Sequence, residues 1–155
     1  RRYLGLHEIV GPKHNATILQ MWKTLHLPFT DDETPWCAGF VGFCLENVGI
    51  RSTRAGGARM YAHWGQELKE PVPGCIVVFW RGSRNGINGH VGFVVGLDKH
   101  GNLLVLGGNQ GDQVCIKAFP RDRVLSYRWP AGEPLPVGAK LKVSNQNVAV
   151  SNNEA

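Results

Sequence analysis

The stretch TPWCAGFVGFC, residues 34–44, combines a helix start with an almost wholly apolar run. Thr34 followed by Pro35 is typical of an N-cap and a first helical position, which makes Cys37 the third residue of the helix. The apolar residues that follow predict that this helix is buried in the core. The sequence thus places a cysteine at the exposed end of a buried helix and not in its middle.

The position at a helix start bears on the reactivity of the Cys37 thiol. Free backbone N–H groups and the positive end of the helix dipole favour an anion at a helix start. They are expected to lower the pKa of the thiol, to produce a nucleophilic thiolate and to hold a developing oxyanion. The alternative is an inert cysteine that fills space, because unpaired cysteines are commonly buried.

The segments before and after this helix predict an α+β fold. In HNATILQMWKTL, residues 14–25, the apolar positions Ile18, Leu19, Trp22 and Leu25 follow helical spacing, with Asn15 as N-cap. The central helix is expected to run to about Asn47 and to end at Gly49, and a third short helix is expected over 54–64, before Gly65. From Pro71 the runs CIVVFW, HVGFVVGL, LLVLGG, QVCIKAF and VLSYRW are short, β-branched and aromatic, which predicts antiparallel strands. N-terminal helices should therefore pack on one antiparallel sheet of five to six strands.

Composition and charge bound the domain and its partners. The length suits one domain, expected over 1–130, followed by a polar, proline-bearing and flexible tail over 131–155. Seventeen Lys and Arg against 12 Asp and Glu give a formal net charge of +5, which favours polyanionic surroundings such as a bacterial wall. The basic residues are scattered, so no nucleic-acid partner is expected. No apolar run suits a membrane span or a secretory signal, no CxxC pair suggests a metal, and we expect a monomer without a cofactor.

A thiol nucleophile needs a base, and His90 is the histidine best placed to serve. It opens the apolar strand GHVGFVVGL, with glycine before it and glycine two residues after it. A rigid strand would hold the imidazole while small neighbours leave room around it. The alternative is a structural histidine at a strand end.

Asn109 is the candidate for a third group. In LGGNQGD a strand ends in two glycines followed by Asn109, whose amide oxygen can accept a hydrogen bond from an imidazole N–H. The alternative is an ordinary turn asparagine. A cysteine at a helix start, a histidine at a strand start and an asparagine at the next strand's end together follow the logic of a papain-like thiol hydrolase.

Four stretches carry a family resemblance. DETPWCAGFVGFCLENVGI, GHVGFVVGL, LGGNQGDQV and YRWP resemble the CHAP and NlpC-like superfamily of cysteine amidohydrolases and peptidases, in particular phage and bacterial cell-wall hydrolases. The resemblance implies a papain-like α+β fold with Cys37 as nucleophile, His90 as base and Asn109 as the orienting residue. It implies peptidoglycan as substrate, cut at an amide bond in or next to the stem peptide by an endopeptidase or an N-acetylmuramoyl-L-alanine amidase.

Two positions depart from the pattern of that superfamily. Many relatives carry Asp where this chain has Cys75, and several carry Glu two residues before the asparagine, where this chain has Gly107. Catalysis would then rest on a triad without extra carboxylate support. Cys44 and Cys115 are expected to be buried and inert.

The resulting hypothesis is acyl transfer by a Cys37 thiolate paired with imidazolium His90. Trp36 and the loop 81–89, including Asn88 and Gly89, are the candidate substrate walls, although Trp36 also fits a core position.

Two alternative functions remain open. One is a non-catalytic wall-binding or phage structural module of the same fold, and the other is a thiol acyltransferase or peptidase acting on a substrate outside the wall. As a wall hydrolase the protein would suit a phage endolysin or a secreted effector, and its localisation stays open.

Overall fold

The computed structural model describes residues 4–6, 15–27, 36–110, 112–136 and 140–144. The elements in chain order are the helices α1 (Ala16–Thr24) and α2 (Cys37–Asn47), the 3-10 helix η1 (Ala58–His63), the strands β1 (Gln66–Leu68), β2 (Ile76–Trp80), β3 (Gly89–Leu97), β4 (Leu103–Gly107) and β5 (Cys115–Phe119), the 3-10 turn η2 (Arg121–Arg123) and the strand β6 (Val124–Trp129). Helices come first and strands follow, as expected for an α+β fold.

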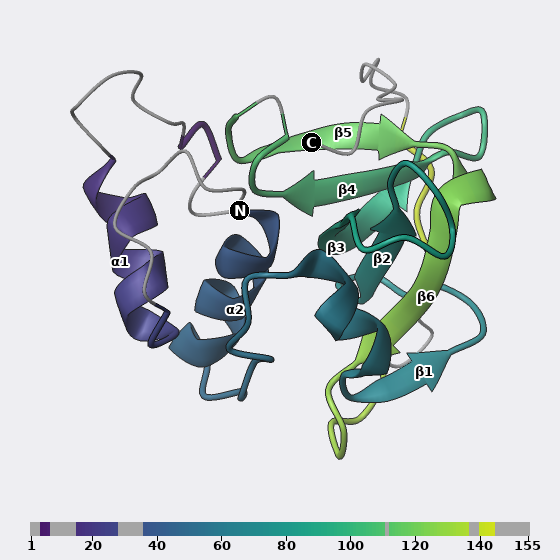
Figure 1. Cartoon of the computed structure of the whole chain (residues 1–155). Coiled ribbons are helices and arrows are strands. Elements are labelled where there is room, and N and C mark those ends of the chain that lie inside the picture. The colour runs from purple at the N-terminus through teal and green to yellow at the C-terminus, as the bar shows by residue number, and fades with distance from the viewer. Residues whose placement is uncertain (1–3, 7–14, 28–35, 111, 137–139, 145–155) are drawn as a thin grey trace.

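The strands form a six-stranded antiparallel sheet in the order β1-β6-β2-β3-β4-β5. Strands β2 to β5 follow one another as neighbours, whereas β6 returns to pair with the free side of β2. Figure 1 shows α1 and α2 together on one side of the molecule, with η1 between α2 and the strands β2 and β6. This is the papain-like α+β architecture that the sequence predicted.

Alternation along the strands divides the core between the two faces of the sheet. On β2, Ile76 and Val78 pack with Cys37 and Tyr61 beneath α2 and η1. The intervening Val77 and Phe79 belong to a separate cluster, on the opposite face, because successive strand residues point to opposite sides. Side chains near Cys37 and side chains near Phe79 therefore start from different faces of the sheet.

The first helix is fixed by its cap and by a close contact with α2. The side-chain oxygen of Asn15 accepts hydrogen bonds from the backbone N–H groups of Thr17 (2.9 Å) and Ile18 (3.4 Å), which confirms the predicted N-cap. A Cβ atom at Gly39 would lie only 2.6 Å from the ring of Trp22, so the glycine allows α1 to approach α2 closely. Helix α2 ends at Asn47 as predicted, and Gly49 takes a left-handed φ of 79°.

Three features differ from the sequence-based expectations. The third helix is a 3-10 helix limited to Ala58–His63, shorter than the expected 54–64. Strand β1 was not expected, because its three residues are mostly exposed and show no apolar alternation. In the stretch 140–144, the backbone carbonyl of Lys142 accepts from the N–H of Leu97 at 3.0 Å, and Val143 forms a parallel bridge with Leu97, so this part of the expected tail lies against the sheet.

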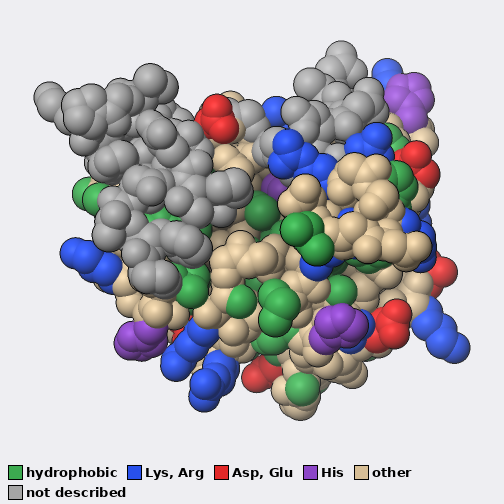
Figure 2. Space-filling model, viewed as in Figure 1, with side chains coloured by type: hydrophobic (Ala, Val, Ile, Leu, Met, Phe, Trp, Pro, Cys, Tyr) green, Lys and Arg blue, Asp and Glu red, His purple; other side chains and the backbone are tan. Residues whose placement is uncertain are grey.

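The surface carries its basic charge in separate groups. Figure 2 shows Lys and Arg side chains spread in small clusters over this face, with other side chains between them. Within the described residues, no helix is both long and apolar enough to cross a membrane. The scattered pattern agrees with the general electrostatic attraction inferred from composition.

Candidate active site

Cys37 is the first residue of α2, and the N-cap is Trp36. The sequence predicted an earlier start with Cys37 as the third residue; Thr34 and Pro35 lie outside the described residues. Trp36 caps the helix without a side-chain hydrogen bond, so the backbone donors of the first turn are not taken by a capping side chain. Cys37 is 6% exposed, and its thiol interacts with the backbone of Val91, on β3, as well as with its own backbone and that of Ala38.

The expected lowering of the thiol pKa does not hold for this environment. Burial raises the pKa of Cys37 above its ordinary value, because it penalises the charged thiolate more than the surroundings favour it. The backbone hydrogen bonds and the positive charge of Arg81 act in the lowering direction and are outweighed. The Cys37 thiol is therefore neutral in this state.

His90, the second residue of β3, is fully buried. Its ring stacks on Phe119, with ring centroids 5.5 Å apart, and on its cross-strand partner Phe79 at 6.3 Å. Burial lowers the pKa of the imidazole to about 4, helped by the positive charges of Arg81 and Lys117 and opposed by the hydrogen bond that the ring donates to Gln110. Like Cys37, the imidazole is neutral at neutral pH.

The amide beside the His90 ring belongs to Gln110 and not to Asn109. The distance from Nε2 of His90 to Oε1 of Gln110 is 2.9 Å. The amide nitrogen of Gln110 donates to the carbonyl oxygens of Cys115 (2.8 Å) and Val105 (3.2 Å), so its oxygen must face the ring. An oxygen can only accept, and this network therefore assigns the proton of the neutral imidazole to Nε2 and the lone pair to Nδ1.

Gly107 provides the room for that contact. A Cβ atom at this position would lie 2.4 Å from Oε1 of Gln110 and 3.3 Å from Nε2 of His90. Asn109 is 8% exposed and takes a left-handed φ of 56°, a conformation that asparagine tolerates better than most residues. The sequence pointed to Asn109 in this turn, and the amide that contacts the ring is that of the next residue, Gln110. The two glycines and the adjacent glutamine were the sequence signals for this contact.

The structure brings the Cys37 thiol to the strand that carries His90, but not to the ring itself: His90 stacks on Phe79 and Phe119, whose cluster lies on the opposite face of the sheet from Cys37. The thiol contacts the backbone of Val91, the next residue along β3, and the charge of Arg81 acts on both groups. Among the described residues, Nδ1 of His90 is buried and has no hydrogen-bond partner, so the thiol and the imidazole are not hydrogen-bonded in this state. Catalytic hydrogen bonds are often long without substrate and tighten when it binds.

The three predicted substrate contacts fall in different places. Trp36 is fully buried in a core cluster with Trp22 and Phe40, so it is a core residue and not a substrate wall. Asn88 is exposed and Gly89 half-buried, at the end of the loop that leads into His90. The carbonyl oxygen of Asn88 accepts hydrogen bonds from Arg59 Nε (2.6 Å) and from the backbone N–H of Arg81 (3.1 Å).

The remaining cysteines are free thiols in three settings. Cys75 is fully buried, whereas Cys44 and Cys115 are only partly buried, less than expected. Burial raises the pKa of both Cys44 and Cys75 to about 11, which keeps them protonated. The thiol of Cys115 contacts the carbonyl oxygen of Gln110 at 3.3 Å, so this cysteine supports the amide that orients His90.

The fold is α+β, with a buried cysteine at the start of a helix. The neighbouring strand carries a histidine that is hydrogen-bonded to a side-chain amide. This combination defines the class of papain-like thiol proteins. The CHAP domain family matches residues 29–109, more than half of the chain, and the chain belongs to this family. CHAP domains are generally cysteine- and histidine-dependent hydrolases within a peptidoglycan-related group of amidases and peptidases. The match includes Cys37, His90 and Asn109 and ends one residue before Gln110. No curated protein matches the chain.

Proposed function

We propose that this protein hydrolyses peptidoglycan at an amide bond in or next to the stem peptide, through a thioester formed on Cys37. The observation that carries the proposal is the fixed tautomer of His90. The Gln110 amide holds the Nε2–H, so the basic lone pair lies on Nδ1, which lacks a partner among the described residues. A purely structural histidine has no need of a buried unpartnered nitrogen, because such an atom costs free energy.

The reaction begins from a neutral thiol and a neutral imidazole. The reaction requires these two side chains, which start from different faces of the sheet, to come within reach when substrate binds. Nδ1 of His90 then takes the thiol proton as sulfur attacks the carbonyl carbon. The negative charge that develops on the carbonyl oxygen is stabilised by backbone N–H groups at the start of α2, including that of Cys37. Gln110 takes the orienting role that the family resemblance gave to Asn109.

Collapse of the tetrahedral adduct completes the acyl transfer. The imidazolium of His90 donates its Nδ1 proton to the departing amine nitrogen, the C–N bond breaks and a thioester remains on Cys37. His90 then accepts a proton from water, whose oxygen attacks the thioester, and the thiol is restored with release of a carboxylate. The positive charge of Arg81 favours the anionic states of this sequence.

Mass spectrometry of digested peptidoglycan tests the proposal. Walls of several chemotypes are incubated with wild type, with Cys37→Ala and with Cys44→Ala, a matched loss of a thiol on the same helix. Soluble fragments are expected from wild type and Cys44→Ala and not from Cys37→Ala, and their masses name the bond. Fragments from Cys37→Ala would reject the nucleophile. No fragments from any protein would favour a non-catalytic wall-binding module or a thiol enzyme with another substrate.

A further inference from the structure

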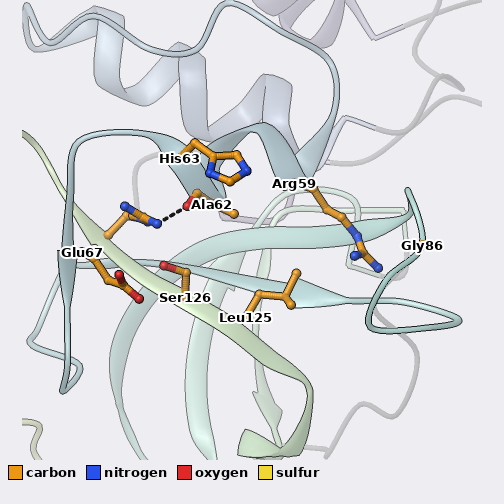
Figure 3. Close-up of a pocket in the computed structure, with 8 residues that line it drawn as sticks. Arg59, Ala62, His63, Glu67, Gly86, Leu125 and Ser126 are labelled. Carbon is orange, nitrogen blue, oxygen red and sulfur yellow. Dashed lines mark hydrogen bonds between the residues drawn. The ribbon is translucent and has the colours of Figure 1, made fainter.

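A pocket lies on the side of η1 that faces β6 and encloses about 400 Å³, which is within the range of small-ligand sites. Figure 3 shows Leu125 and Ser126 on its floor, Ala62 and His63 above them, Glu67 at one end and Arg59 with Gly86 at the other. The loop that contains Gly86 leads directly into Gly89 and His90. One wall of the pocket is therefore continuous in sequence with the strand that carries His90.

A β-bulge shapes the floor of the pocket. Val78 of β2 pairs with Ser126 of β6, but the next residue, Phe79, pairs with Val124, so Leu125 is an extra residue on β6. Leu125 and Ser126 consequently both line the pocket, although neighbouring strand residues usually point to opposite faces. Bulges of this kind often re-aim side chains beside functional sites.

Two buried donors at the pocket have no hydrogen-bond partner among the described residues. The hydroxyl oxygen of Ser126 is one, and the side chain around it is only 7% exposed. Nε of Arg128 is the other, although a second nitrogen of the same guanidinium donates to the carbonyl oxygen of Ala62. Buried polar groups without partners are costly, so these two positions call for an acceptor.

The charged side chains around the pocket indicate which kind of hydrogen-bond acceptor would bind there. Each of the three guanidinium nitrogens of Arg59 donates one hydrogen bond, to the carbonyl oxygens of Ser83, Arg84 and Asn88, and these bonds hold the loop in place. Glu67 makes no ion pair within the described part of the chain. Two arginines against one carboxylate leave a net positive pocket, which favours an anion, and a carboxylate matches both a guanidinium N–H and a hydroxyl.

The pocket lies on the Cys37 side of the sheet. Ser126, Val78 and Val91 are successive register partners across β6, β2 and β3. The side chains of Val78 and Val91 pack with Cys37, whose thiol contacts the Val91 backbone. Two strand spacings, roughly 10 Å, separate Ser126 from Val91 across the sheet, with Ala58 and Tyr61 of η1 packed in the same core cluster as Val78 and Val91.

We propose that this pocket binds a carboxylate of the stem peptide, with Ser126 Oγ and Arg128 Nε as donors. The proposal rests on the proposed function for the identity of the peptide. It assigns to this chain a substrate contact on β6, outside the residues 29–109 that the family matches. Arg59 acts as a positioning residue, because it holds the loop that forms one wall.

The binding test uses Cys37→Ala protein, so that no peptide is consumed. Two stem peptides of identical sequence are titrated, one with free carboxylates and one with every carboxylate amidated, while the 1H–15N signal of Arg128 Nε is followed. Arg128→Lys, which lacks this atom, assigns the signal. We expect a saturable shift with the acid peptide and at least roughly 10-fold weaker binding of the amidated peptide, as for loss of a charge-assisted hydrogen bond. Equal binding of both peptides, or an unmoved Arg128 signal with bound acid peptide, would overturn the proposal.

A variant measurement isolates the hydroxyl. Ser126→Ala should bind the acid peptide roughly 5-fold more weakly and leave the amidated peptide unchanged, as expected for loss of one hydrogen bond. Thr24→Ala, which removes a hydroxyl at the far end of α1, serves as control and should bind like its parent. Equal affinities of Ser126→Ala and parent for the acid peptide would remove Ser126 from the site. Wall digestion by wild type decides the thiol chemistry separately, so failure of one proposal leaves the other measurable.

Discussion

At the scale of single residues, the chemistry of His90 is set by a neutral amide. A carboxylate in contact with an imidazole would favour its charged form, whereas the oxygen of Gln110 only fixes the ring and its proton. Burial then dominates and the pKa of His90 falls to about 4. His90 is consequently unprotonated far into the acid range, so the pH profile of the proposed activity is the most direct test of the contact with Gln110.

Gln110→Glu should move the acid limb of the kcat/KM profile to higher pH. The added negative charge favours imidazolium, so the pKa of His90 should rise by roughly one unit or more. Gln113→Glu adds the same charge in the same turn without facing the ring and serves as control. An acid limb that stays in place in Gln110→Glu would mean that Gln110 does not act on His90.

Gly107→Ala tests the same contact through space instead of charge. The new Cβ atom would come within 2.4 Å of Oε1 of Gln110 and must displace the amide. Because small displacements of a positioning group are costly, we expect kcat/KM to fall about 10- to 100-fold with little change in KM. Gly57→Ala, where the nearest atom is 3.6 Å away, should retain wild-type kinetics. Wild-type kinetics in Gly107→Ala would show that activity does not depend on the position of the Gln110 amide beside His90.

At the scale of elements, long periodic segments were predictable and short or polar ones were not. The cap and apolar spacing of α1, the end of α2 and five strands follow directly from sequence patterns. Strand β1 is set by pairing with β6, which no local pattern encodes. The contact of Gln110 with His90 likewise depends on the missing side chain at Gly107, and only the folded packing determines that distance.

The contact between α1 and α2 gives a prediction at this scale. Gly39→Ala would place a methyl group 2.6 Å from the ring of Trp22, and the two helices would have to separate. We expect a loss of about 1–3 kcal/mol in the free energy of unfolding, the usual effect of overpacking. Urea denaturation measures it, with Gly57→Ala expected within about 0.5 kcal/mol of wild type. Equal midpoints for Gly39→Ala and wild type would mean that α1 adjusts without cost.

At the scale of the whole molecule, the buried imidazole couples the site to folding. The pKa of His90 is about 4 in the folded chain against an ordinary value of 6.5. Between these two pH values His90 binds a proton in the unfolded chain but not in the folded chain. The free energy of unfolding therefore falls as the pH is lowered through this window. Above pH 6.5 the effect is absent, since His90 is then neutral in both states.

Lowering the pH from 7 to 4 should therefore cost the wild type roughly 3 kcal/mol through this one residue. His90→Phe removes the titrating group and keeps an aromatic ring beside Phe119 and Phe79, so it serves as the reference. The measurement is the free energy of unfolding of both proteins across the pH range. A constant difference between them would show that His90 titrates normally in the folded state.

The neutral, 6% exposed thiol of Cys37 also governs how the protein meets oxidants. Peroxide and alkylating reagents react with thiolates, and an enclosed protonated sulfur offers them little to attack. The protein should therefore keep its nucleophile reduced in oxygenated surroundings without a dedicated reductant. Sensitivity to oxidation would arise only during turnover, in the brief interval when His90 holds the proton of Cys37.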